Sequence, residues 1–382
     1  WLPGEAVDIP MPKANVRVVE DGYPTAVERA GHGVQRAFIL TALQHLAFAQ
    51  APGTRGNAAS QQDHSEAPAS SPHLEGNEST LTLPNLILGI EEPELYQHPS
   101  RQRHLSRVFL QLATEGIKGV AQNVQIIYTT HSPLFVDLQR FEQIRLLRKE
   151  KVEDSKPKQT KVFHATREQV TREVERADGV PERTYSPEGT FARLQTLMTP
   201  WTNEGFFADV VVLVEGEEDR AAILGVAKAM GHDLESKDIA VVPCMGKGNL
   251  HKAAAIFKNF GIPIYVIWDS DQGREEKENK EKNHRLLRFF TAEITDYPET
   301  VTENFACFKV KLETTLRCEL GDDLYTRLLM ECKTDFGYGK VEQARKSPLV
   351  VQTIIERAAE QGKESQTLKQ IVTKIVSLKE GG

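Results

Sequence analysis

Four carboxylates stand at spacings that suit the binding of a cation. Glu215 ends an apolar stretch, and Asp219 follows four residues later, about one helical turn away. Asp269 and Asp271 end a second apolar stretch, and strand residues two apart point to the same side. Ligands bind at the carboxyl ends of parallel strands, so we expect the four carboxylates to converge at one edge of a sheet.

The chemistry expected of this cluster is that of a divalent metal. Packed carboxylates repel one another until a proton or a cation relieves the repulsion, and hard oxygen ligands select Mg²⁺ or Mn²⁺ over zinc. Two such ions about 4 Å apart can activate a water and stabilise the leaving oxygen of a phosphodiester. Glu217 and Glu218 are expected to face solvent at a helix start. The alternative is that all these acids only cap that helix.

Alternating apolar elements provide the framework for these acids. The pattern predicts strands over 210–214, 239–243 and 263–268, with helices over 217–231 and 249–260. Alternation of this kind predicts an α/β fold with a parallel sheet flanked by helices. We expect a charged loop over residues 273–285 and a mostly helical chain from there to Lys379.

A second set of candidate residues lies nearer the N-terminus. An apolar strand over 86–90 runs into Glu91 and Glu92, which has the form of a Walker B strand. There the first acid holds Mg²⁺ through water and the second polarises the attacking water. A strand over 126–130 ends at His131, which is placed to contact a γ-phosphate. The alternative is a helix cap and an ordinary histidine.

Glycines precede the first expected helix, at residues 33–49. Gly31, Gly33 and Gln35 stand at its start, where backbone amides favour a phosphate. Residues 50–79 consist largely of Ala, Ser, Gly, Gln, Pro and His, which predicts a flexible insertion. No GxxxxGK[ST] motif occurs in the sequence, so we do not expect this chain alone to hydrolyse ATP.

These N-terminal motifs resemble the C-terminal lobe of an ABC-type ATPase of the SMC-like class, over roughly residues 25–150. The resemblance implies that residues 31–35 form the signature motif, that Glu91 and Glu92 are the Walker B acids, and that His131 is the H-loop histidine. The family usually has Asp at the position of Glu91 and Ser at that of Ala30.

Residues 209–273 resemble the Toprim fold through VVLVEGEED, VVPCMGKGN and YVIWDSDQG. The resemblance implies that Glu215 binds metal or transfers a proton, that Asp269 and Asp271 are metal ligands, and that Asp219 is a further ligand. An SMC-like ATPase joined to a Toprim domain is the arrangement of the OLD (overcoming lysogenisation defect) family of endonucleases.

In the OLD family a further acid and a lysine from the C-terminal helical part complete the site. Glu303 and Glu313 are the candidate metal ligands, and Lys340, in a loop that opens a helix, is the candidate catalytic lysine. Lys346 and Lys374 remain possible, and ordinary surface charge is the alternative for all five.

The resulting domain prediction has four parts. Residues 1–165 form a partial ATPase lobe, and 166–207 form a helical connection. Residues 208–300 form the Toprim core, and 301–382 form the helical part that completes the nuclease domain.

The predicted function is metal-dependent cleavage or nicking of duplex DNA, associated with an ATPase module, in phage defence or DNA processing. Two Mg²⁺ or Mn²⁺ ions are the expected cofactors, with ATP in the complete protein. The alternative is an ATP-dependent DNA clamp or scaffold whose Toprim domain binds metal without cutting. The four cysteines show no zinc spacing and no domain with a nucleophilic tyrosine is evident, which disfavours a primase or topoisomerase. RNA cleavage stays open.

Composition limits the partners and the setting. The net charge of −7 disfavours a generic nucleic-acid-coating protein, and no apolar run approaches the roughly 20 residues of a membrane helix. We expect reduced thiols in the cytoplasm, a homodimer or larger assembly, and, because the chain starts at Trp1, a fragment. The candidate DNA contacts are Arg101, Arg103, Arg107, Lys247, Lys252 and Lys258.

Overall fold

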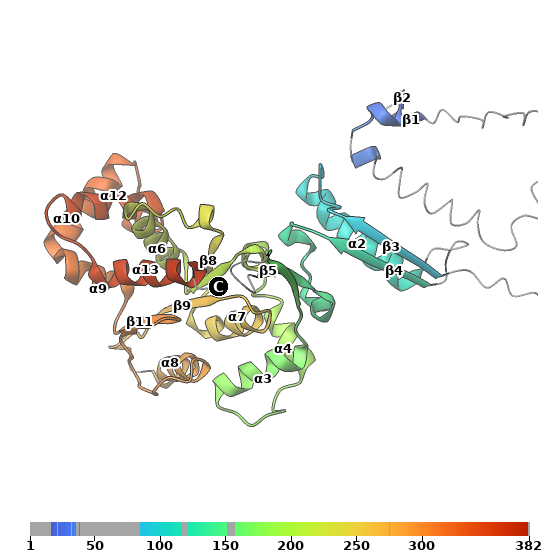
Figure 1. Cartoon of the computed structure of the whole chain (residues 1–382). Helices are drawn as coiled ribbons and strands as arrows, with labels where there is room; N and C mark the ends of the chain where they lie inside the picture. The colour runs from blue at the N-terminus through green and yellow to red at the C-terminus, as the bar shows by residue number, and fades with distance from the viewer. Residues whose placement is uncertain are drawn as a thin grey trace, which may run out of the picture. The chain divides into compact units, whose positions relative to one another are not determined.

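The chain separates into two compact units, Trp1–Phe135 and Val136–Gly382, and each is considered by itself (Figure 1). The predicted insertion at 50–79 and most of the predicted helix at 33–49 lie outside the described residues. The computed structural model describes residues 17–20, 22–31, 33–35, 38, 85–116, 121, 123–150, 157–274 and 276–380.

Two small sheets occur in the part of the first unit that the structure describes. Strands β1 (Arg17–Glu20) and β2 (Tyr23–Ala26) form an antiparallel hairpin. Strands β3 (Asn85–Glu91) and β4 (Asn123–Thr129) pair in parallel, and α2 (Pro99–Glu115) packs against β4. The strands predicted at 86–90 and 126–130, and the helix that follows the first of them, are therefore confirmed.

Alternation along β3 and β4 gives this pair one covered and one open face. Leu86, Leu88 and Ile126 pack around a small buried cluster, whereas Ile87 and Ile127 are each 66% exposed. Strand side chains alternate between faces, so Ile87 and Ile127 lie on the face opposite this cluster.

The second unit begins with an antiparallel hairpin of β5 (Leu146–Glu150) and β6 (Gln159–Phe163). The structure thus divides the chain after Phe135, about thirty residues before the predicted boundary, and the hairpin belongs with the second unit. Helices α3 (Arg167–Asp178) and α4 (Pro187–Leu194) follow.

A five-stranded sheet forms the centre of the second unit, in the order β10-β11-β9-β7-β8. The strands β7 (Val210–Val214), β8 (Ile239–Pro243), β9 (Ile264–Asp269) and β11 (Phe305–Phe308) are parallel to one another, and the edge strand β10 (Thr300–Val301) is antiparallel. The predicted parallel sheet is confirmed, and β10 and β11 extend it beyond the predicted end of the core at residue 300.

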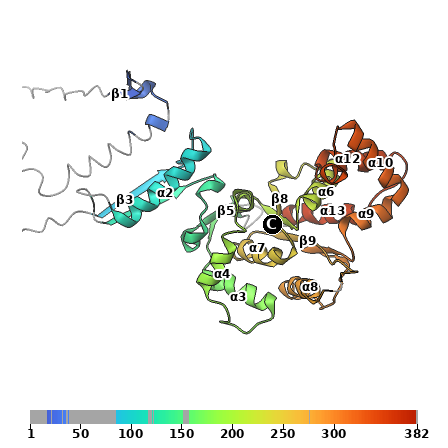
Figure 2. The same cartoon turned by 180° about the vertical axis from the view of Figure 1, so that it is seen from behind.

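Helices cover both faces of this sheet, which explains why every residue of β7 is buried. Alternate β7 residues belong to two separate cores. Val210, Val212 and Val214 pack with α6 (Glu217–Ala229) and the C-terminal helices. Val211 and Leu213 pack with α7 (Lys247–Asn259), α8 (Lys277–Phe289) and α3. The same two groups of helices lie on opposite sides of the sheet in the reverse view (Figure 2).

The charged loop predicted at 273–285 was wrong for most of its length. Helix α8 starts at Lys277 because its charged residues occupy an exposed face while Leu286, Leu287 and Phe289 join the core. A few apolar residues on one side are enough to make the helix amphipathic, although its overall apolar content is low.

The C-terminal helices confirm the predicted helical part. Helices α11, α12 and α13 pack against α6, and the most extensive contact is between α6 and α12, where Gly225 meets Val351. These helices are α9 (Leu312–Leu320), α10 (Asp322–Asp335), α11 (Val341–Arg345), α12 (Pro348–Ala359) and α13 (Gln366–Glu380). None of the helices in the described part of the chain is long and apolar enough to cross a membrane.

Candidate functional site

Two neighbouring strands bring the first pair of acids together. Glu215 directly follows β7, and Asp269 is the last residue of β9, the strand beside it. The Glu215 Oε1 atom accepts a hydrogen bond from the Asp269 backbone N–H at 2.8 Å. Asp219, in the first turn of α6, accepts one from the Gly216 N–H at 3.1 Å. The predicted convergence of these three acids at the carboxyl edge is thus present.

Asp271 reaches the same edge by a different route from the one predicted. Strand β9 ends at Asp269, and Asp271 has a φ of +55°, so the two acids are not alternate residues of one strand. The Asp271 N–H donates to the Val310 carbonyl at 3.0 Å, which holds the turn after β9 against the segment after β11. The Asp269 Oδ1 atom accepts from the N–H of Leu312, the first residue of α9, at 2.8 Å.

A buried lysine binds the Asp271 carboxylate. Lys247, the first residue of α7, is 5% exposed, and its Nζ lies 2.8 Å from Asp271 Oδ2. The prediction that Lys247 contacts DNA was therefore wrong, because its ammonium already has buried protein partners. Lys258 is exposed and pairs with Glu173 at 3.3 Å, while Lys252 is half-buried and burial lowers its pKa.

Burial disfavours the charged forms of these acids and so raises their pKa values. Burial, together with the charges of the Asp219 and Glu215 carboxylates, raises the pKa of Asp269 to about 8. Burial also raises the pKa of Glu215 to about 7 and that of Asp219 to about 6. Lys247 opposes the rise at Glu215, and Lys311 opposes that at Asp219. A divalent cation would favour the ionised forms of all three, so their chemistry fits such an ion.

The donor atoms do not surround a common point. Among residues 17–380 outside the gaps given above, no three His, Cys, Asp or Glu side chains are arranged to hold a metal. Backbone N–H groups and Lys247 engage one oxygen of each acid. Glu217 and Glu218 turn away, as predicted, and pair loosely with Arg220 and Arg345, each at 3.8 Å.

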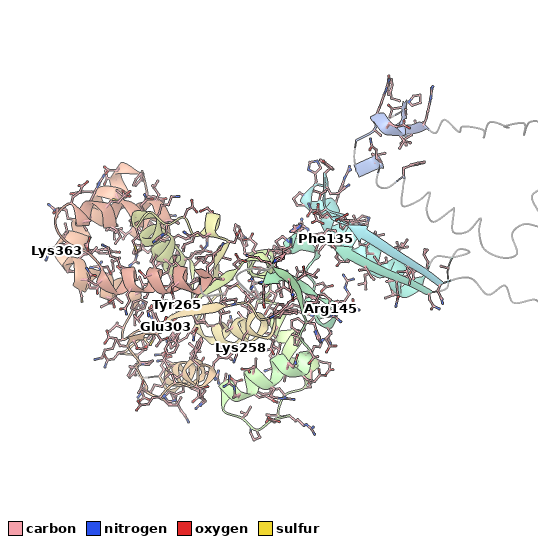
Figure 3. The ribbon with its side chains drawn as sticks, viewed as in Figure 1. Phe135, Arg145, Lys258, Tyr265, Glu303 and Lys363 are labelled. Atoms are coloured by element: carbon pink, nitrogen blue, oxygen red, sulfur yellow. The ribbon has the colours of Figure 1, made fainter. Side chains whose placement is uncertain are left out.

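Glu303 does not belong to this edge of the sheet. It lies between β10 and β11, and since Phe305 pairs with Val266 in a parallel register, Glu303 is at the amino end of the sheet. Figure 3 labels it near Tyr265, at the start of β9. Glu303 forms an ion pair with Lys374, so the prediction that either residue completes the acidic cluster was wrong.

Two other C-terminal candidates have different surroundings. Glu313 is in the first turn of α9, close to the acids, but Arg317 at 3.0 Å and Arg345 both pair with it. Lys340 is exposed at the N-terminus of α11, and like Lys346 it has no side-chain hydrogen bond or ion pair among the described residues. Their roles stay predictions.

Lys311 is the cation that sequence reasoning missed. It precedes α9, and its charge acts on Asp219. The signal for it was the short apolar stretch at 305–308, which forms a further parallel strand. Because this strand is parallel to β9, the residues that follow it lie at the same carboxyl edge of the sheet as Asp269.

The N-terminal unit brings together two of its predicted residues. The His131 Nε2 atom lies 3.5 Å from Glu92 Oε1, and the His131 N–H donates to Glu94 Oε1 at 2.6 Å. Glu91 is the exposed last residue of β3. Of these three carboxylates only Glu91 is exposed, while Glu92 and Glu94 are partly buried.

The predicted signature segment lies against the chain that follows β3. A Cβ added at Gly33 would come within 2.6 Å of the Gln97 amide nitrogen, so the backbone is closely approached there. The Gln35 amide folds back onto the Ala30 carbonyl at 2.8 Å, and Gly31 opens the turn. Arg101, Arg103 and Arg107 are exposed on α2, and their contact with DNA stays a prediction.

Known families match both units. The family described as "Overcoming lysogenization defect protein-like, TOPRIM domain" matches residues 206–271, and "AAA ATPase domain" matches residues 5–136. An OLD nuclease of Thermus scotoductus is 32% identical, covering 57% of this chain and 45% of that protein. These matches support membership of the OLD family. The chain is also 24% identical to the Old nuclease of Escherichia phage P2, over 64% of this chain and 33% of that protein.

The chain spans less than half the length of either curated relative. Among solved structures, it is similar to the C-terminal region of the Burkholderia pseudomallei OLD protein, with 19% identity and a TM-score of 0.31. That match covers 45% of this chain and 99% of the other. It is also similar to the C-terminal region of the Xanthomonas campestris pv. campestris OLD protein, with 15% identity and a TM-score of 0.30. That match covers 46% of this chain and 96% of the other.

Proposed function

We propose that this OLD-family chain carries a metal-dependent DNA endonuclease site at the carboxyl edge of its central sheet. The observation that carries the proposal is the meeting of Glu215, Asp219 and Asp269, three partly buried acids whose pKa values are all raised. Such a cluster is destabilising unless a cation compensates its charge, and carboxyl groups with pKa values shifted in this way are typical of functional sites. OLD nucleases are among the relatives, which supports phosphodiester cleavage as the reaction.

The residues have distinct roles in this proposal. Glu215, Asp219 and Asp269 would hold Mg²⁺ or Mn²⁺, with Asp271 beside them. Metal bound there would supply an activated water and stabilise charge on the phosphate oxygens. Without metal, hydrogen bonds from the backbone N–H groups of Asp269, Gly216 and Leu312 hold the side chains of Glu215, Asp219 and Asp269, respectively. Lys311, exposed at the same edge, would attract the DNA phosphate.

An ATPase module accompanies the nuclease site in this proposal. Glu92 and His131 lie side by side, as nucleotide contacts in a complete ABC-type site would require. We expect no ATP hydrolysis by this chain alone, and we expect a homodimer or larger assembly in which the module gates cleavage during phage defence or DNA processing.

The second candidate is an ATP-dependent clamp or scaffold that binds metal without cutting. One observation favours it: in the described part of the chain the acids do not surround a common point, and Lys247 occupies Asp271. Cleavage assays separate the two candidates directly.

The test is nicking of supercoiled plasmid by the purified chain with Mg²⁺, Mn²⁺ or EDTA. Glu215→Gln and Asp269→Asn should each abolish nicking while the circular dichroism spectrum stays unchanged. Glu217→Gln, which changes an exposed acid at the same helix start, is the matched control and should cut normally. Equal cleavage by all four proteins would reject the nuclease site, whereas metal binding without any cleavage would favour the clamp.

A further inference from the structure

Lys247 sits in a buried cage of three oxygen atoms. Its Nζ donates to Asp271 Oδ2 at 2.8 Å, to Asn279 Oδ1 at 2.8 Å and to Asn283 Oδ1 at 3.2 Å. An ammonium carries three protons, and all three have acceptors here. A buried charge is stable only when it is fully paired in this way, so the cage is a built feature of the fold.

The two asparagines of the cage are themselves fixed. They lie four residues apart on α8 and therefore on one face of that helix. Both Asn279 and Asn283 donate through Nδ2 to the Ser270 carbonyl, at 3.2 and 2.9 Å, and Asn283 also donates to the Asp296 carbonyl at 2.7 Å. With the amide nitrogens engaged, the amide oxygens point to the ammonium.

The cage links three elements around the turn that carries Asp271. Lys247 comes from α7, the asparagines come from α8, and Ser270 and Asp271 belong to the turn after β9. The Asp271 backbone is in the left-handed region, which few non-glycine residues adopt without support from their surroundings. The ammonium contacts only one oxygen of Asp271, and the other has no protein hydrogen bond among the described residues.

We propose that Lys247 is a positioning residue, an internal cation that sets the Asp271 carboxylate before any metal arrives. This role rests on the proposed function in one respect, since the carboxylate is set for a divalent ion bound by Glu215 and Asp269. Arginine would not replace lysine, because its planar fork does not match three oxygens that converge on one point. Methionine would fill the space but leave the Asp271 carboxylate buried without a partner.

The experiment compares the metal-stripped wild type with Lys247→Met, Lys247→Arg and Lys247→Met/Asp271→Asn. The matched control is Lys228→Met, which removes an ion pair of similar length, 2.7 Å to Asp233, that is exposed to solvent. Melting temperature (Tm) is measured without metal, and Mn²⁺ affinity is measured by isothermal titration calorimetry well below Tm. Plasmid nicking is then followed as a function of Mn²⁺ concentration.

Lys247→Met should lower Tm by about 5 °C or more and raise the Mn²⁺ Kd by about 10-fold or more. The double variant, which removes both charges, should recover at least half of the lost Tm but none of the Mn²⁺ affinity. Lys247→Arg should not restore affinity, and Lys228→Met should leave both quantities close to wild type.

Unchanged Mn²⁺ affinity in Lys247→Met would overturn the positioning role, even if Tm falls, since a purely structural ion pair produces that pattern. The proposed nuclease function fails separately. If the wild type binds Mn²⁺ without cutting DNA, and Lys247→Met weakens that binding, then the positioning role stands and the nuclease proposal does not.

Discussion

The two units of this chain place the same local pattern, an apolar strand followed by acids, in opposite environments. Among the described residues of the N-terminal unit, β3 has one partner strand and one open face, and Glu91 is exposed. In the C-terminal unit β7 lies between two strands and two layers of helices, and Glu215 is largely buried.

The difference shows which surroundings raise the pKa of an acid at the end of a strand. An exposed carboxylate keeps its hydration, whereas a carboxylate at the edge of a covered sheet loses water and gains acidic neighbours. The Asp269 carboxyl therefore has a raised pKa, and it owes this to the neighbouring strands and helices more than to its own segment.

The largest expected contrast is in cleavage. Asp269→Asn should lower metal-dependent plasmid nicking by about 100-fold or more, which corresponds to roughly 2.7 kcal/mol in the activation barrier. Glu92→Gln, the same kind of change in the N-terminal unit, should stay within about 3-fold of wild type when ATP is absent. Similar losses in both variants would mean that the two acidic regions form one functional unit.

Core truncation tests the difference in burial. Leu213→Ala in β7 should reduce the free energy of unfolding by about 2–5 kcal/mol, because it opens a cavity in a fully buried core. Ile87→Ala in β3 should change it by no more than about 0.5 kcal/mol, since that side chain is mostly exposed. Urea titrations followed by circular dichroism measure both, and equal effects would contradict the contrast.

The raised pKa values predict a specific dependence on pH. The folded-state pKa of Asp269, about 8, lies above its ordinary value of 3.8, so folding favours the protonated acid. Its contribution to stability is present below about pH 4 and is lost as pH rises to 8. In EDTA, Asp269→Asn should therefore be more stable than wild type by several kcal/mol at pH 8.5 and close to it at pH 4. Melting curves in EDTA across this range provide the measurement, and a difference independent of pH would refute the assignment.

Two glycines test the packing of the units at smaller scale. Gly225→Ala should cost about 1–2 kcal/mol, because the added methyl would lie 2.6 Å from the Val351 Cβ and 2.7 Å from the Pro348 carbonyl. Gly89→Ala in β3 meets no atom within 4 Å and should be nearly neutral. Thermal melts of both variants decide this, and a neutral Gly225→Ala would show that α6 and α12 can move apart.

The smallest effect is expected at the opposite edge of the central sheet. Removing the exposed Glu303–Lys374 ion pair by Lys374→Met should cost less than about 1 kcal/mol and leave nicking unchanged. Stability and nicking are measured on the same preparation. Loss of cleavage without loss of stability would return Lys374 to the functional site.

The local sequence was sufficient to predict most of the elements and which acids follow the buried strands. An apolar run of five residues followed by Glu215, and another followed by Asp269, identify strands and their carboxyl ends, because a strand covered on both faces requires apolar residues and charge is tolerated only where it ends. The prediction was less successful where a helix such as α8 is rich in charge, since periodicity is then carried by only a few residues.

What the sequence determined by itself is the order of strands and helices and which acids end buried strands, since both follow from local composition. Only the tertiary structure decided which distant charges meet those acids. The parallel register of β11 with β9 sends Glu303 to the far edge and brings Lys311 to the near one. Packing of α7 against α8 encloses Lys247 with Asp271. Contacts between residues far apart in the chain depend on strand order and helix packing, which the local sequence does not specify.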